Sequence, residues 1–140
     1  MAALQNIIWK KEFDTGIVLI DKQHRNLVDI INNLNEAHNQ KREKEVLRET
    51  ILKLVEYTKN HFRFEENHMS QLGFPELEEH KVLHSSFIQK MIDILTQLKK
   101  ENYENLTDDI LVFLHKWMID HIQGDDKEYG NFYKLKNQNS

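Results

Sequence analysis

The stretch HFRFEENHM, residues 61–69, holds two histidines and two glutamates and contains no Gly or Pro. On a helix, His61 and Glu65 differ by about 40° in direction and about 6 Å along the axis, so both can reach one centre. His68 lies about 10 Å along the axis from His61, too far to share a compact centre with it. Glu65 and His68 also have the E-x-x-H spacing of ferritin-like di-iron proteins, which need that spacing twice. The chain contains it once, so we interpret it as accidental.

Outward from this stretch, four segments carry apolar residues at alternating steps of three and four, the pattern of a helix face packed on a core. Each face also carries a histidine where packing alone would favour Leu or Ile. The faces are, in chain order, Ile20, His24, Leu27, Ile31, Leu34; Leu47, Ile51, Leu54, Thr58, His61, Glu65, His68, Leu72; Leu77, His80, His84, Phe87, Met91, Ile94, Leu98; and Leu106, Ile110, Leu114, Trp117, His121. The sequence therefore predicts an all-α fold, an up-down-up-down antiparallel four-helix bundle.

The connections follow from the residues that end helices. The Asn-rich residues 32–40, the stretch 71–76 with Gly73 and Pro75, and residues 101–109 are expected to separate the helices. Thr107 or Asn105 is expected to cap the fourth helix. We expect one domain over residues 1–140: an N-terminal arm (1–19), the bundle (about 20–124) and a short C-terminal extension (about 125–140).

Composition excludes several classes of function. The 140 residues fit one domain, and 19 basic against 23 acidic residues argue against a nucleic-acid surface. The absence of Cys excludes disulfides and thiolate metal sites, and is compatible with a reducing compartment. No signal peptide and no apolar run long enough to span a membrane is evident. We expect a cytoplasmic protein with no membrane partner.

Five histidines converge if the four helices alternate in direction. The start of the first helix, the end of the second, the start of the third and the end of the fourth then lie together. These segments carry His24, His61, His80, His84 and His121. A single histidine on an apolar face is usually hydrogen-bonded to a carbonyl, but five at one depth with Glu65 are costly to bury without a common partner. Imidazole with carboxylate suits iron, zinc or copper.

These residues carry a resemblance to a known family. The motifs are WKKEFDTGIVLIDKQH (9–24), HFRFEENHM (61–69), GFPELEEHKVLHSSF (73–87) and WMIDHIQGDDKEY (117–129). In order and spacing they resemble the hemerythrin family, in particular its single-domain bacterial members. The resemblance implies a non-haem centre of two iron ions bridged by an oxo or hydroxo group. It implies His24 and His61 as ligands of one iron, His80, His84 and His121 as ligands of the other, and Glu65 and Asp126 as bridges.

Asp126 is implied by the resemblance and not by the apolar faces. On a continuous α-helix it would point about 140° away from His121. We therefore expect the backbone to change course near Gly124, because glycine permits unusual conformations. Asp125 is the rival for the same role, and the family spacing favours Asp126.

The resemblance also implies an apolar O2 pocket around the open iron position. Residues at suitable offsets are Leu27, Phe62, Trp117, Met118 and Ile122, although ordinary core packing accounts equally well for each of them. The remaining histidines, at positions 38, 68 and 115, match no ligand and are expected at the surface or at helix ends.

The function implied by the resemblance is reversible O2 binding at the iron held by two histidines, for storage, transport or delivery, with an oxygen-consuming enzyme as the expected client. The alternatives are oxygen or redox sensing, and a di-iron peroxidase or nitric-oxide scavenger. No general acid or base stands out beyond the ligands, which favours a protein that is not an enzyme.

Overall fold

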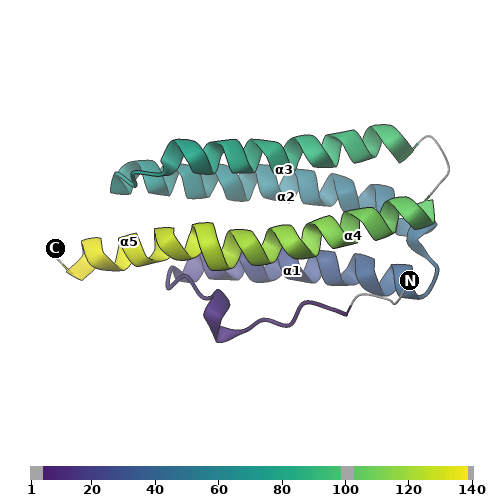
Figure 1. Cartoon of the computed structure of the whole chain (residues 1–140), viewed down its shortest axis with the longest axis horizontal. Helices are drawn as coiled ribbons and strands as arrows, with labels where there is room; N and C mark the ends of the chain where they lie inside the picture. The colour runs from purple at the N-terminus through teal and green to yellow at the C-terminus, as the bar shows by residue number, and fades with distance from the viewer. Residues whose placement is uncertain (1–4, 99–102, 139–140) are drawn as a thin grey trace.

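The computed structural model describes residues 5–98 and 103–138, and Figure 1 shows a bundle of long antiparallel helices. Its elements are η1 (Lys11–Phe13), α1 (Val18–Asn39), α2 (Glu43–Leu72), α3 (Leu77–Gln97), α4 (Tyr103–Asp120), the π-helical segment η3 (His121–Asp126) and α5 (Lys127–Gln138). These residues include no strand. The predicted all-α four-helix bundle is confirmed. Residues 1–4 of the expected arm, 101–102 of the third connection and 139–140 of the extension lie outside the described residues.

The helices turn their apolar faces inward as the sequence pattern predicts. On α1 all five residues of the predicted face are buried, and each fully buried Leu or Ile stabilises the fold by about 1.5–3 kcal/mol. The apolar side chains form two clusters. The larger one contains Leu27 and Phe62, and the smaller one contains Ile20 and Met69. His24 lies between Ile20 and Leu27 in the chain, so the buried histidines form a polar layer between two apolar clusters.

Two helix boundaries differ from the prediction. The Asn-rich residues 32–39 stay helical, because Leu34, Asn35 and Ala37 are buried on α1. The expected caps Thr107 and Asn105 are wrong, because α4 begins at Tyr103 and contains both residues. Thr107 is fully buried, and burial overrides the weak preference of Thr for helix ends.

The turn between α2 and α3 forms where it was predicted. Gly73 ends α2 in the left-handed conformation, with φ of 72°, which glycine adopts without a steric penalty. Its N–H donates to the carbonyl oxygen of Ser70, and the N–H of Phe74 donates to that of Met69. Because of this tight turn, α3 runs antiparallel to α2, and the first residues of α3 lie beside the last residues of α2.

The N-terminal arm runs along α1 and is fastened just before that helix begins (Figure 1). Asp21 accepts hydrogen bonds from the backbone N–H of Thr15 (2.8 Å), the Thr15 hydroxyl (2.7 Å) and the N–H of Gly16 (3.2 Å). Phe13 is buried in the larger cluster. Gly130 of α5 packs so closely on the arm that an added Cβ would lie 2.2 Å from the Thr15 carbonyl oxygen.

The last part of the chain continues the fourth helix. α4, η3 and α5 form one rod in Figure 1, so the expected extension is helical as far as residue 138. Within the described residues, no helix is both long and apolar enough to cross a membrane.

Candidate metal centre

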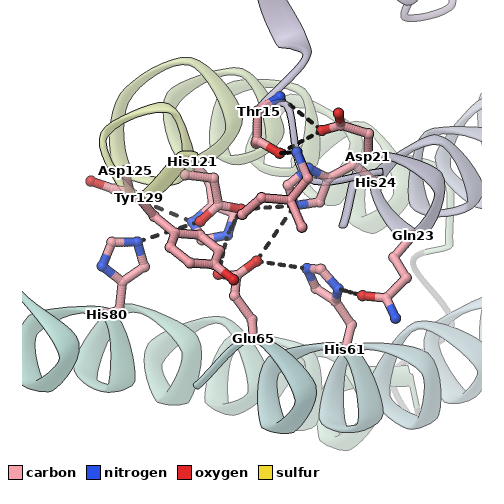
Figure 2. A network of polar contacts seen from close by, with 12 residues as sticks. Thr15, Asp21, Gln23, His24, His61, Glu65, His80, His121, Asp125 and Tyr129 are labelled. Carbon is pink, nitrogen blue, oxygen red and sulfur yellow. Dashed lines mark hydrogen bonds and ion pairs between the residues drawn. The ribbon is translucent and has the colours of Figure 1, made fainter. Parts of the chain in front are cut away.

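Five side chains from three elements of the bundle bring their potential ligand atoms within 4.8 Å of one another. They are His24 from α1, His61 and Glu65 from α2, and His121 and Asp126 from η3, and all five are buried. Figure 2 shows four of these side chains, those of His24, His61, Glu65 and His121, pointing toward one another from opposite sides of the bundle. The cluster thus joins three helical rods at one depth.

The third helix supplies two further histidines. The Nε2 of His84 lies 3.3 Å from Oε1 of Glu65, and the Nε2 of His80 lies 3.4 Å from Oδ1 of Asp126. All seven residues predicted as ligands are therefore gathered around the two carboxylates. Asp125, the rival of Asp126, is partly exposed and lies 3.8 Å from Nδ1 of His121, on the outer side of that ring.

The two oxygens of Glu65 face different histidines. Oε2 lies 3.3 Å from His61 and 3.8 Å from His24. Oε1 lies 3.3 Å from His84 and 3.8 Å from His121. Glu65 thus stands between a group of two histidines (His24 and His61) and a group from α3 and η3.

Asp126 also touches both groups. Its Oδ2 lies 2.7 Å from Nε2 of His24 and 2.9 Å from Nε2 of His121, and its Oδ1 faces His80. The three-histidine group is therefore His80, His84 and His121. Each carboxylate makes contact with both groups, which is the arrangement a bridging ligand needs.

The inward atoms of the cluster lack hydrogen-bond partners. Among the described residues, Nε2 of all five histidines and both oxygens of Glu65 and Asp126 are buried without a partner in hydrogen-bond geometry, short as some of the contacts are. Buried polar atoms without partners are costly. Nitrogen and carboxylate oxygen are suitable ligands for a transition metal, so the donor set fits non-haem iron.

The carboxylates are ionised even though they are buried. Burial alone would raise the pKa of Glu65, but contacts with His24, His61 and His84 hold that pKa well below its ordinary value. Burial and the charge of Glu65 would likewise raise the pKa of Asp126, but His121 and His24 hold it low. The centre therefore offers two negative charges at neutral pH.

In the absence of metal, protons balance these charges. Burial would lower the pKa of His24, but Asp126 and Glu65 raise it to about 9. Burial opposes the same change at His121, but the charge of Asp126 and the side-chain contact with Asp125 raise its pKa to about 10. For His61, burial prevails and lowers the pKa. A metal cation replaces the protons on such a site, so binding releases them.

A change of helix type explains how Asp126 reaches the centre. Residues 121–126 are π-helical, and in a π-helix the residue five positions on takes the place that the fourth takes in an α-helix. Asp126 therefore lies above His121. The expected change of course near Gly124 is confirmed, but it does not require glycine, because the φ of Gly124 is not positive and an added Cβ would meet nothing within 4 Å.

Aromatic rings cover the outer faces of two histidines. Phe62 stacks on His84 with ring centroids 3.9 Å apart and planes within 3°. Trp117 stacks on His121 at 4.5 Å and 17°. The other predicted pocket residues, Leu27, Met118 and Ile122, are buried in the larger apolar cluster.

Two outer partners of the ligand histidines, and one buried tyrosine near the centre, escaped the sequence analysis. Nδ1 of His61 lies 2.6 Å from Oε1 of Gln23, and Nδ1 of His84 lies 2.8 Å from Oε2 of Glu66. The tyrosine is Tyr129, which is fully buried, contacts His68, and points its hydroxyl toward Glu65 in Figure 2. Burial and the charges of Glu65 and Asp126 raise the pKa of Tyr129. The available signal was that a ligand histidine needs an acceptor for its second nitrogen.

The remaining histidines lie outside the cluster, as predicted, but they are less exposed than predicted. His38 is largely buried between helices, with Nε2 2.6 Å from Oδ1 of Asp108 and Nδ1 3.5 Å from Glu43. His115 contacts the carbonyl oxygens of Leu111 and of Gln5 in the arm. These residues connect helices and the arm.

The fold and the buried histidine–carboxylate cluster define a metal-binding four-helix bundle. Residues 15–133 match the family model described as the hemerythrin HHE cation binding domain. The chain belongs to the hemerythrin family, which confirms the predicted resemblance and implies non-haem iron as the metal.

Known relatives agree with this assignment. The chain is 32% identical to a bacteriohemerythrin of Stenotrophomonas maltophilia over 91% of this chain and 82% of that protein. It is 33% identical to a bacteriohemerythrin of Pseudomonas aeruginosa over 90% and 80%, and 26% identical to a myohemerythrin of Theromyzon tessulatum over 86% and 88%. The crystal structure of a hemerythrin L114Y mutant superimposes with a TM-score of 0.77 at 25% identity, covering 93% of this chain and 97% of that one.

Proposed function

We propose that this protein binds O2 reversibly at a pair of non-haem iron ions and stores or delivers it. One observation carries the proposal: Glu65 and Asp126 each contact both the two-histidine group and the three-histidine group. A carboxylate in that position suits two cations, one beside each group. Membership of the hemerythrin family supports iron as the metal.

The residues divide the work between the two ions. His24 and His61 would hold one iron, the three-histidine group would hold the other, and Glu65 and Asp126 would bridge them. An ion beside His24 and His61 would have one histidine ligand fewer than its neighbour, so this is the side at which O2 would bind. When bound, this iron supplies the reversible coordination of O2.

Buried apolar side chains around the ligand histidines would keep water from the centre, and Phe62 lies beside His61 of the two-histidine group, with ring centroids 5.6 Å apart. Leu27, Phe62, Met118 and Ile122 are all at most 3% exposed, and Trp117 covers the ring of His121. An apolar surround slows the entry of protons and the loss of a charged product. Such a surround favours release of unchanged O2 over turnover, so we propose that the protein is not an enzyme.

A second candidate function is peroxide reduction, and one observation favours it. The hydroxyl of Tyr129 contacts His68, whose ring is only half-buried. This pair places a proton donor near Glu65 with access toward solvent. Reduction of peroxide consumes protons, whereas reversible O2 binding does not need them from outside.

Repeated exposure to air and vacuum separates the two functions. The iron-loaded protein should change its visible spectrum in air and recover it under vacuum over several cycles, with little loss. Irreversible conversion to a ferric form that consumes added peroxide would instead support the second candidate. The Tyr129→Phe variant is the matched comparison, since it should cycle like the wild type if the first proposal is correct.

A cytoplasmic location and an oxygen-consuming client enzyme belong to the same proposal. The absence of Cys is compatible with a reducing compartment. Cell fractionation, and co-purification with an oxygenase or oxidase, would test these two points.

A further inference from the structure

The outer nitrogens of the ligand histidines have unequal partners. Nδ1 of His61 lies 2.6 Å from the amide oxygen of Gln23, a neutral group (Figure 2). Nδ1 of His84 lies 2.8 Å from a carboxylate oxygen of Glu66. Nδ1 of His121 lies 3.8 Å from the carboxylate of Asp125. The hydrogen-bonded carboxylate of Glu66 therefore stands behind the three-histidine group, with Asp125 beyond hydrogen-bond distance of His121 on the same side. The neutral partner stands behind the two-histidine group, where Nδ1 of His24 has no hydrogen-bond partner among the described residues.

The chemistry of each contact fixes its direction. Nε2 of His84 faces Glu65 and must be unprotonated to bind a metal. Nδ1 therefore carries the hydrogen, and its N–H donates a hydrogen bond to Glu66. The same argument makes His61 the donor and the oxygen of Gln23 the acceptor. A carboxylate that accepts this bond raises the basicity of the opposite nitrogen more than a neutral amide does.

Glu66 contacts His84 and does not form ion pairs with the surface cations near it. The side chain of Glu66 is 23% exposed and lines a cleft of about 470 Å³ between α2 and α3, together with Lys59, Arg63 and Lys81. None of these three cations lies within ion-pair distance of Glu66 in the described part of the chain, and Lys81 pairs with Glu78. Solvent reaches Glu66 through the cleft and partly screens its charge. The effect of that charge on His84 is therefore moderate.

We propose that Glu66 and Gln23 are positioning residues that make the two halves of the metal centre electronically unequal. Glu66, with Asp125 in support, makes the three-histidine half the stronger donor and stabilises ferric iron there relative to the two-histidine half. Second-partner hydrogen bonding is one of the means by which proteins set the potential of iron. This inference rests on the iron pair proposed above and concerns how that pair is tuned.

Three variants test it by changing one charge at a time. Glu66→Gln keeps the shape and the hydrogen-bond acceptor and removes the charge, and Gln23→Glu adds a charge behind His61. Glu56→Gln removes the same charge from an exposed position of α2 and is the matched control. The readouts are the midpoint potentials of the iron protein from spectroelectrochemical titration and the affinity of the metal-free protein for Co2+.

We expect Glu66→Gln to raise the midpoint potential of the iron in the three-histidine half by ~59 mV. For one electron this shift corresponds to a tenfold change in the ratio of reduced to oxidised iron. Gln23→Glu should lower the other potential, and Glu56→Gln should leave both unchanged. Co2+ affinity should fall about tenfold in Glu66→Gln, the lower end of the range for lost outer partners.

Equal potentials and equal Co2+ affinities in the wild type and Glu66→Gln would overturn the inference. Failure of the proposed function would look different, because the wild type itself would then not recover its spectrum under vacuum, or would hold fewer than two irons. In that case the Co2+ affinities of the three variants still decide whether Glu66 positions His84.

Discussion

His121 and Asp126 are five positions apart, yet Nε2 of His121 lies 2.9 Å from Oδ2 of Asp126. In an α-helix of the same length the two side chains would point about 140° apart. The π-helical winding of residues 121–126 brings them to one face. π-Helical turns are uncommon and occur mostly at functional sites, and here the turn places a carboxylate between two groups of histidines.

Gly124→Ala should preserve the centre and stabilise the fold. Gly124 has helical backbone geometry and space for a Cβ, so alanine should raise the free energy of unfolding by about 0.5–1 kcal/mol. Urea denaturation and iron content measure the two effects. Loss of iron in this variant would show that glycine is needed there after all.

Deletion of Gly124 should preserve the metal centre as well. Removing one residue lets the π-helical turn of residues 121–126 become α-helical, and Asp126 then follows His121 by four positions, which keeps both side chains on one face of the helix. Helical content by circular dichroism and iron per chain should both remain. Loss of the iron in this variant would contradict the role assigned to the π-helical turn.

Gly130→Ala should destabilise the protein, in contrast to Gly124→Ala six residues earlier. An added Cβ would meet the Thr15 carbonyl at 2.2 Å, and such overpacking costs about 1–3 kcal/mol. The arm should loosen, which faster amide hydrogen exchange at Thr15 and Gly16 would reveal. An unchanged unfolding midpoint would mean that the arm moves aside at no cost.

The positions that follow helical periodicity could be predicted from the sequence. His61 and Glu65 share a helix face because they are four apart, and the remaining faces of the bundle follow from the same rule. Asp126 could not be found in this way, because no pattern in residues 121–126 predicts a π-helical turn. It came from the resemblance to the family.

The outer partners lie beyond periodicity for a different reason. Gln23 and Glu66 each adjoin a ligand in the chain, so they point away from the face that carries it. Their acceptors reach the histidines of a neighbouring helix. Contacts between helices depend on their relative rotation, which a pattern within one helix does not specify. The wrong cap at Thr107 has the same origin, because tertiary burial decided it.

The metal-free protein should lose stability as the pH rises above neutrality. His24 and His121 have pKa values raised to about 9 and 10, so their contribution is complete below the unfolded value of about 6.5 and is lost as the pH rises through the folded values. The lowered pKa values of Glu65 and Asp126 give a contribution that is present above about pH 4–5 and is lost as the pH falls.

Thermal melts of metal-free protein at pH 6.5 and pH 9.5 measure this effect. The melting temperature of the wild type should be lower at pH 9.5 than at pH 6.5. The difference between the two pH values should be smaller in a His24→Asn variant. A melting temperature that rises between these pH values would contradict the assigned protonation of His24 and His121.

His68→Ala should leave the iron in place. His68 lies outside the cluster and contacts the hydroxyl of Tyr129. Its loss leaves that buried hydroxyl without its partner, at a cost of about 1–3 kcal/mol in the free energy of unfolding. Glu65→Ala is the comparison, because it removes a carboxylate that touches both histidine groups. Equal loss of iron in both variants would restore the E-x-x-H interpretation.

The most direct measurement of the central claim is the number of iron ions per chain in purified wild-type protein. If Glu65 and Asp126 bridge the two groups of histidines, iron analysis should give two ions per chain in the wild type and fewer in Glu65→Ala and in Asp126→Ala. One iron per chain in the wild type, or two in either variant, would contradict the bridged centre.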